Sequence, residues 1–345
     1  MKISVAMATL NGSKFIFDQL QSLALQKHIP WELVVCDDGS IDDTVERIQE
    51  FAESAPFPVR VYRNETNLGF ARNFLKAARL CQGEWISYCD QDDVWLPNKL
   101  EDVCAVVEQD PIINLVLQNA FICNETLSHE GRLFPNRIRQ GSYLPQSQYG
   151  FWVWPGFLQT FKANLLHILD EELLPKSYYP GHARMTHDKW TCLIANATGK
   201  IRVIENPAAL YRRHEKAVTG SYERQGIAAR VKKSLPVTGE TYSFLATVAA
   251  ETATYLRDIA LQAKEDTDAD FTSASNAFDR IAYIHVCRAE LYDSPRLFLR
   301  TKSFFAIIRA GGYLGPPMIS LGGRSALKDV LRVIGIIAPG KYYRP

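Results

Sequence analysis

The sequence predicts an α/β protein with a mostly parallel central sheet flanked by helices, followed by a helical C-terminal region. From Ile3 to about Asp90, short apolar runs alternate with stretches of helical period, as expected of right-handed parallel βαβ units. After about Gly220, long helical stretches replace this alternation. We therefore expect two parts, residues 1–220 and residues 221–345.

The first part begins with strands and helices in alternation. We expect strands at Ile3–Ala8, Trp31–Cys36, Pro58–Tyr62 and Glu84–Asp90. We expect the intervening helices at Ser13–Gln26, from Ser40 to about Phe51, and at Phe70–Leu80. Because the carboxyl ends of parallel strands meet at one edge of an open sheet, the residues that follow these strands should gather there.

The remaining elements are less regular. Apolar runs predict short strands at Leu115–Leu117, Phe121–Cys123, Ile201–Ile204 and Ala208–Tyr211, whereas the polar stretch Asn124–Gln148 predicts a long loop. Helices are expected at Thr186–Ala197, Thr241–Lys264, Ser273–Leu291 and Arg296–Arg309. A last apolar helix, Arg324–Ile337, either packs in the core or lies as a basic amphipathic helix on an anionic membrane.

Composition excludes several classes of protein. The net charge of +1 over 345 residues gives no global field for a polyanion, so we expect no nucleic-acid partner. The seven cysteines are scattered and include no C-x-x-C pair, which argues against a disulfide framework or a zinc knuckle and favours a reducing cytosol. With no apolar stretch long enough to span a bilayer, we expect a cytoplasmic protein that can still contact the inner face of the membrane.

Three carboxylates, Asp90, Asp92 and Asp93, come directly after the apolar run Trp85–Cys89 of the fourth expected strand. Such oxygen ligands suit Mg²⁺ or Mn²⁺, and Mg²⁺ commonly takes one or two carboxylates together with phosphate oxygens. The alternative is a solvated acidic turn before the next helix. The turns after the first two strands, residues 8–12 and 37–40, should lie at the same edge, and this convergence favours a metal-bridged diphosphate site.

Other segments suit such a site. Arg72 lies in the first turn of an expected helix and could reach a phosphate that the helix N-terminus also attracts. Asp188, close to Trp190, is a candidate general base, because partial desolvation raises the pKa of a carboxyl toward the working pH; the alternative is a helix cap. Arg213 and His214 follow the last strand and could donate to a leaving diphosphate.

These segments together resemble those of family 2 glycosyltransferases, which are inverting enzymes with the Rossmann-like nucleotide-binding fold called GT-A. The matching segments, in the family's order, are Ala8–Asn11, Asp37–Ser40, Asn67–Asn73, Asp90–Leu100 and His187–Trp190. Two of the chain's segments, Asp90–Trp95 and Tyr211–His214, also resemble bacterial rhamnosyltransferases of O-antigen and capsule assembly.

The resemblance implies roles for individual residues. Asp38 would bind the nucleobase, Asp92 would be the main metal ligand, and Asp90 would lie near the ribose or act as a second metal ligand. Asp188 would be the general base. The other expected contacts of the nucleotide sugar are Thr9, Asn11, Arg72, Arg213 and His214. The candidate acceptor contacts are Trp95, Trp154, His187 and Trp190.

The chain departs from the family pattern at two positions. Leu10 stands where many members have an aromatic residue, which removes a stacking partner for the nucleobase. His187 stands where many members have Glu, which leaves Asp188 as the only carboxylate in its motif.

The resemblance implies metal-dependent transfer of a sugar, with rhamnose one candidate, from a nucleotide-diphosphate donor. The acceptor would be a saccharide or a lipid-linked oligosaccharide, and the metal would be Mg²⁺ or Mn²⁺. The reaction would invert the configuration at the anomeric carbon. The C-terminal region would bind the acceptor or dock on a membrane or partner. The alternatives are a noncatalytic sugar-binding module with the same fold and, less favoured because Ala8–Ser13 lacks G-x-G-x-x-G, a NAD-dependent oxidoreductase.

Overall fold

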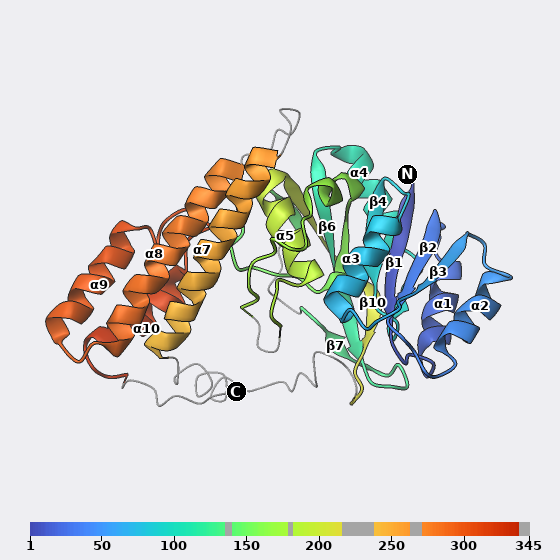
Figure 1. Ribbon diagram of the computed structural model, residues 1–345, viewed down its shortest axis with the longest axis horizontal. Coiled ribbons are helices and arrows are strands. Elements are labelled where there is room, and N and C mark those ends of the chain that lie inside the picture. Colours follow the sequence, from blue (N-terminus) through green and yellow to red (C-terminus); the bar gives the residue numbers. More distant parts are fainter. Residues whose placement is uncertain (135–139, 179–181, 216–237, 263–270, 338–345) are drawn as a thin grey trace. The chain divides into compact units, whose positions relative to one another are not determined.

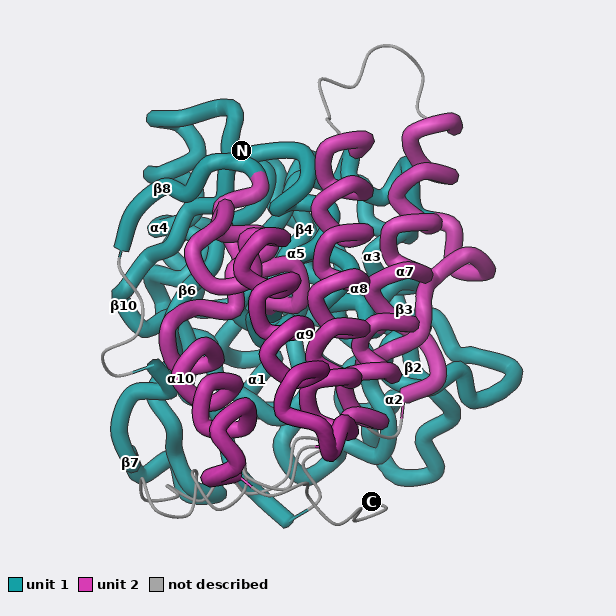
Figure 2. The backbone as a smooth tube through the Cα atoms, turned by 90° about the vertical axis from the view of Figure 1, so that its left-hand side faces the viewer, with its two compact units in different colours: residues 1–145, 153–169, 186–222 teal, residues 146–152, 170–185, 223–345 magenta. Residues whose placement is uncertain are grey.

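The computed structural model describes residues 1–345 with the exception of 135–139, 179–181, 216–237, 263–270 and 338–345. The chain forms two compact units (Figure 2). Unit 1 comprises residues 1–145, 153–169 and 186–222, and unit 2 comprises residues 146–152, 170–185 and 223–345. This division differs from a single cut near residue 220, because two short segments from the first part of the sequence belong to unit 2.

Unit 1 is built on a mixed sheet that has ten strands in the described residues, and its first half is parallel as predicted (Figure 1). The parallel strands are β1 (Ile3–Thr9), β2 (Glu32–Asp37), β3 (Val59–Arg63) and β4 (Trp85–Cys89), in the order β3-β2-β1-β4. The helices between them are α1 (Ile16–Ala24), α2 (Thr44–Ala52) and α3 (Phe70–Leu80). Because strand order reverses after β3, right-handed crossovers place α1 and α2 on one face and α3 on the other.

The second half of the sheet is mixed. Its strands are β9 (Gln159–Lys162), β6 (Ile113–Cys123), β10 (Lys200–Arg212) and β5 (Val94–Trp95), in this order beyond β4. Strand β9 is antiparallel to both neighbours, whereas β6 and β10 are parallel to each other. Two short strands, β7 (His129–Arg132) and β8 (Gly141–Tyr143), add to β6 and β10. The helical segments here are α4 (Lys99–Gln109), η1 (Gly156–Leu158), η2 (Ala163–Ile168) and α5 (His187–Thr198).

Three sequence-based expectations for this half need correction. The apolar runs on either side of Gln118 form one strand, β6, because the Gln118 side chain is buried and donates to the Lys99 carbonyl. The two short strands expected around Pro207 are also one strand, β10, in which register shifts on both sides of Pro207 accommodate the missing N–H. The expected long loop contains β7 and β8.

Unit 2 is helical, as the sequence predicts, and its helices are α7 (Gly239–Gln262), α8 (Phe271–Asp293), α9 (Leu297–Arg309) and α10 (Gly322–Val333). Part of its core consists of Tyr242, Ile284, Leu291, Tyr292 and Ile307. The inserted segments pack on these helices: the Tyr149 hydroxyl lies 3.2 Å from His285 Nε2, and Lys176 pairs with Glu251 at 2.7 Å. Among the described helices, none combines the length and apolar character needed to cross a bilayer.

Candidate functional site at the carboxyl edge of the sheet

The ends of β1, β2 and β4 meet at one edge of the sheet, as the sequence predicts. Thr9 pairs with Asp37 across β1 and β2, and Met7 pairs with Cys89 across β1 and β4. The turns that follow are joined directly. The Gln91 side chain accepts from the Leu10 N–H at 3.0 Å and donates to the Leu10 carbonyl at 3.1 Å.

Thr9 and Asn11 support the turns. The Thr9 hydroxyl donates to the buried Asp37 carboxylate at 3.0 Å, and Thr9 is 2% exposed. Asn11 has a positive φ of 49°, and its side-chain oxygen accepts from the Ile41 N–H at 2.9 Å. The Thr9 hydroxyl has only one hydrogen and donates it to Asp37, so a contact of Thr9 with the nucleotide sugar stays a prediction that would use its oxygen atoms as acceptors. Asn11 retains its amide NH₂ as a donor.

Asp38 anchors the segment before α3. Its carboxylate accepts from the N–H groups of Leu68 at 2.7 Å and Gly69 at 2.8 Å, and from Asn64 Nδ2 at 2.8 Å. Negative charge is favourable at a helix N-terminus. The two N–H groups that lie just before α3, where we expected the helix N-terminus to attract a phosphate, therefore face a carboxylate. Arg72 is exposed on the first turn of α3.

The acidic cluster, Asp90, Asp92 and Asp93, brings one carboxylate oxygen of each residue within 4.8 Å of the others. Burial, with smaller contributions from Asp92 and Asp188, raises the pKa of Asp90 to about 8. Burial, with smaller contributions from Asp92 and Asp90, raises the pKa of Asp93 well above its usual range. Asp93 Oδ1 accepts from the Arg212 N–H at 3.0 Å, whereas its buried Oδ2 has no hydrogen-bond partner among the described residues.

These residues fit a divalent cation. All the donors are hard oxygens, which Mg²⁺ and Mn²⁺ prefer. The pKa values of Asp90 and Asp93 are raised by burial and by neighbouring carboxylates, of which Asp92 contributes to both, and a cation at this position would lower them. A solvated acidic turn does not describe this cluster, because Asp93 is fully buried.

Arg212 lies in the basic segment Tyr211–His214, and its role in supporting the backbone of the acidic cluster is one that sequence reasoning missed. It is 3% exposed, and its guanidinium donates to the carbonyls of Asp92 and Glu125 at 2.9 Å each and to Asp18 Oδ2 at 2.7 Å. It also lies 4.5 Å from the centre of the Phe15 ring. These partners lie far from Arg212 in the sequence, so no local signal identified them.

The two residues after Arg212 differ in their surroundings. His214 Nε2 lies 2.8 Å from Asp92 Oδ2, and the His214 ring packs 4.9 Å from that of Phe15. Arg213 Nη1 lies 3.9 Å from a carboxylate oxygen of Glu130 on β7. The structure thus joins His214 directly to the acidic cluster.

Asp188, the candidate base, is the second residue of α5 and is half-buried. Its Oδ1 accepts from the Thr186 hydroxyl at 2.5 Å and from the Lys189 N–H at 2.9 Å, which fixes the carboxylate. Its charge contributes to the raised pKa of Asp90. The structure therefore brings Asp188 into electrostatic range of the acidic cluster.

His187 is packed among aromatic rings. It is 4% exposed, its ring stacks on Phe74 with centroids 4.2 Å apart, and the Tyr88 ring meets it edge-on at 4.7 Å. Burial lowers the pKa of His187 to about 4, against an opposing contribution from Asp188. We conclude that His187 is a neutral packing residue beside Asp188, and the expectation that it contacts the acceptor is corrected.

The three tryptophans expected to contact the acceptor also lie in the core. Trp190 is fully buried, Trp95 is 2% exposed and Trp154 is 5% exposed. The Trp154 indole N–H donates to the Gln118 carbonyl at 2.9 Å. Their rings offer no face on which a sugar could stack, so we correct this expectation to a packing role.

Lys99 is a second residue that sequence reasoning missed. It is fully buried, and its ammonium donates to the Phe157 carbonyl at 2.9 Å and lies 4.5 Å from the centre of the Trp95 ring. Burial lowers the pKa of Lys99 to about 8, while Cys89 and Asp93 act in the opposite direction. Lys99 thus contributes positive charge beneath the acidic cluster.

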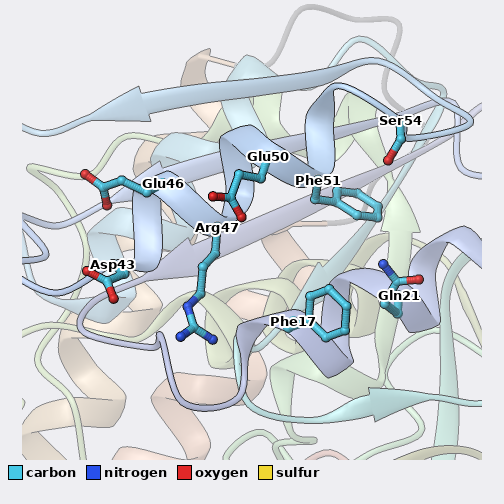
Figure 3. Close-up of a pocket in the computed structure, with 8 residues that line it drawn as sticks. All are labelled: Phe17, Gln21, Asp43, Glu46, Arg47, Glu50, Phe51 and Ser54. Carbon is cyan, nitrogen blue, oxygen red and sulfur yellow. The ribbon is translucent and has the colours of Figure 1, made fainter.

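A pocket of about 450 Å³ lies elsewhere in unit 1, between α1 and α2 (Figure 3). Its lining includes Phe17 and Gln21 from α1, and Arg47 and Phe51 from α2. None of the candidate site residues lines it. The site at the carboxyl edge is therefore distinct from this pocket.

The parallel strands, the acidic cluster at their carboxyl edge and the nearby carboxylate of Asp188 form the arrangement expected of a glycosyltransferase with the GT-A fold. Residues 4–171 match the family described as Glycosyl transferase family 2. This matched segment, just under half of the chain, is similar to that family.

Two curated relatives illustrate the match. A UDP-Glc:alpha-D-GlcNAc-diphosphoundecaprenol beta-1,3-glucosyltransferase of Escherichia coli, WfgD, is 34% identical over 99 residues, which are 29% of this chain and 38% of that protein. An uncharacterized glycosyltransferase of Nostoc sp. is 31% identical over 217 residues, which are 62% of this chain. The chain spans 38% of the length of the first relative and 65% of the second.

A solved structure supports the fold. The crystal structure of Staphylococcus aureus TarS 1-349 in complex with UDP-GlcNAc has a TM-score of 0.52 and 20% sequence identity to this chain. The similarity covers 91% of this chain and 93% of that one. At this level of identity, the comparison establishes the fold alone.

Proposed function

We propose that the protein is an inverting glycosyltransferase that moves a sugar from a nucleotide-diphosphate donor to a saccharide acceptor during surface-polysaccharide assembly. The observation that carries the proposal is the cluster of three carboxylates within 4.8 Å, in electrostatic range of a fourth, Asp188. The name of the E. coli relative specifies a UDP-sugar donor and a diphosphoundecaprenol-linked acceptor. This supports a lipid-linked acceptor at the inner face of the membrane, and rhamnose stays one candidate for the donor sugar.

The metal-binding residues are Asp92 and, beside it, Asp90. A bound Mg²⁺ or Mn²⁺ would stabilise the charge on the leaving diphosphate. His214 holds one oxygen of Asp92 at 2.8 Å and so orients that ligand. We assign Asp38 to the nucleobase, since its carboxylate retains acceptor capacity, and Arg72 and Arg213 to the diphosphate.

Asp188 is assigned the role of general base. It accepts the proton of an acceptor hydroxyl while the hydroxyl oxygen forms a bond to the anomeric carbon. The bond from that carbon to the diphosphate oxygen breaks on the opposite side, so the configuration inverts. The Thr186 hydroxyl and the Lys189 N–H fix one oxygen of Asp188 and leave the other to take the proton.

The test combines donor binding with donor turnover. Thermal shifts are measured with a series of nucleotide sugars, each with Mn²⁺, with Mg²⁺ and with chelator. Asp92→Ala should abolish both the metal-dependent shift and turnover, whereas Asp188→Ala should keep the shift and lose turnover. Asp279→Ala, at a surface pair in unit 2, is the matched control and should change neither.

Two outcomes would contradict the assignments. Wild-type turnover by Asp188→Ala would show that Asp188 is not the base. Metal-dependent donor binding without turnover of any donor on lipid-linked or free saccharide acceptors would instead favour a noncatalytic sugar-binding module.

A further inference from the structure

Helices α9 and α10 of unit 2 present an apolar, basic surface, and we propose that it docks on the anionic surface of a lipid bilayer. We call this the α9–α10 surface; its apolar residues are Phe298, Phe305, Ile308, Leu327, Val330 and Ile334. The two helices pack against each other and against α8 (Figures 1 and 2). The proposal concerns where the protein binds, and it does not depend on the sugar chemistry.

Helix α9 turns large apolar side chains outward. Phe298 is 77% exposed and Phe305 is 53% exposed, and their spacing of seven residues puts them on one face of the helix. The residues that α9 buries are Ser303 and Ile307. The outer face is therefore more apolar than expected of a helix whose outer side meets only water.

Helix α10 has the reverse of the usual polarity. Its buried residues are Asp329 and Arg332, whereas Leu327 is 61% exposed and Ile334, directly after the helix, is 58% exposed. The Asp329 carboxylate is held inside unit 2 by Arg288 at 2.9 Å and by the hydroxyl of Tyr313 at 2.7 Å. A surface helix normally buries its apolar face and exposes its charges. Because Leu327 and Ile334 are exposed and Asp329 and Arg332 are buried, this side of α10 suits an outer environment that is itself apolar.

The positive charge around the α9–α10 surface indicates that its partner is an anionic lipid bilayer. Residues 294–337 contain seven Lys or Arg residues and one acidic residue, Asp329, although the whole chain has a net charge of only +1; Asp329 and one of the seven, Arg332, are buried. The exposed cations include Lys302 and Arg309 of α9 and Arg324 of α10. Basic residues around an apolar face are attracted to anionic lipid headgroups. A second copy of the same surface would bring like charges together, which disfavours self-association.

The test is flotation of the full chain with vesicles of phosphatidylglycerol and phosphatidylcholine in equal parts, and with phosphatidylcholine alone. We expect binding to the anionic vesicles that weakens as salt is added, because salt screens the headgroup attraction. Replacing Phe298 and Phe305 by Ser should lower the partition coefficient by about tenfold each. Replacing Arg309 and Arg324 by Gln should lower it by about fivefold each.

Phe17→Ser is the matched control. Phe17 is 55% exposed on α1 of unit 1, so this variant loses an exposed ring of the same kind outside the α9–α10 surface and should bind vesicles as the wild type does. Each variant is first shown to be folded by its thermal transition. The thermal shift with nucleotide sugars should be the same in all of them, which separates this proposal from the proposed function.

Three results would overturn the proposal. The first is a folded wild-type chain that does not float with anionic vesicles. The second is equal binding by the wild type and the two Phe variants. The third is a dimer, seen by light scattering, that the Phe298→Ser and Phe305→Ser changes dissociate; the α9–α10 surface would then be an interface between copies.

Discussion

Replacing Arg212 with Met should destabilise the protein far more than the same replacement of a surface arginine. Arg212 is 3% exposed and donates to the carbonyls of Asp92 and Glu125 and to Asp18. The Asp18 side chain is 48% exposed, so that ion pair contributes little. Met would retain the contact with Phe15 but would leave both carbonyls without the guanidinium. We expect the free energy of unfolding to fall by about 3 to 5 kcal/mol.

The same change should weaken metal binding, because the guanidinium holds the backbone of Asp92 in place. Loss of such a supporting contact typically lowers metal affinity by about tenfold or more. Urea unfolding followed by circular dichroism measures the first effect, and titration of Mn²⁺ measures the second. Arg132→Met is the matched control: Arg132 pairs with Glu205 at 3.6 Å, both are partly exposed, and the loss should stay below about 1 kcal/mol. Equal, small losses for the two variants would refute the reasoning.

Two further predictions concern packing and pH. In Gly156→Ala, the new Cβ would lie 2.6 Å from His187 Nε2. We therefore expect the free energy of unfolding, measured with urea, to fall by about 1 to 3 kcal/mol, and turnover to fall as well. The control Gly323→Ala, where the new Cβ meets open space, should be neutral or stabilising. Burial, with a smaller contribution from Arg288, lowers the pKa of His285 to about 3. Below about pH 6.5 the unfolded state therefore binds a proton at His285, whereas the folded state binds it only near pH 3. The free energy of unfolding falls as the pH falls through this range. His285→Phe should reduce that slope by about 1.4 kcal/mol per pH unit in urea titrations at a series of pH values; an unchanged slope would mean that His285 is not buried as a neutral ring.

The sequence was sufficient to predict the carboxyl edge and its acidic cluster. Alternation of apolar runs with helical stretches specifies parallel strands, and parallel strands carry the residues that follow them to one edge. Asp90 and Asp92 therefore lie where the sequence places them, close to the turns after β1 and β2. This inference needs only local pattern and chain topology.

What the sequence could not predict depends on contacts between distant residues. Arg212 and Arg213 are adjacent and identical in type, yet one is a buried brace and the other pairs with Glu130 at a distance of 3.9 Å. The tryptophans show the same ambiguity, since an indole ring suits a sugar-binding wall or a core equally well. Only the three-dimensional packing distinguishes the two roles, and it places both Trp95 and Trp190 in the core.

The interleaving of the two units constrains how the chain reaches its native state. Segments 146–152 and 170–185 belong to unit 2 but precede the last part of unit 1, residues 186–222, in the sequence. Their partners come much later: Phe151 packs on Phe278 with ring centroids 5.9 Å apart, and Lys176 binds Glu251. During synthesis these segments lack their partners until about a hundred further residues have been made, at roughly 5 to 20 residues per second. Unit 2 is thus discontinuous in the sequence and cannot be removed by a single cut of the chain. Because its helices are synthesised last, the nascent chain depends on protection from aggregation until they emerge.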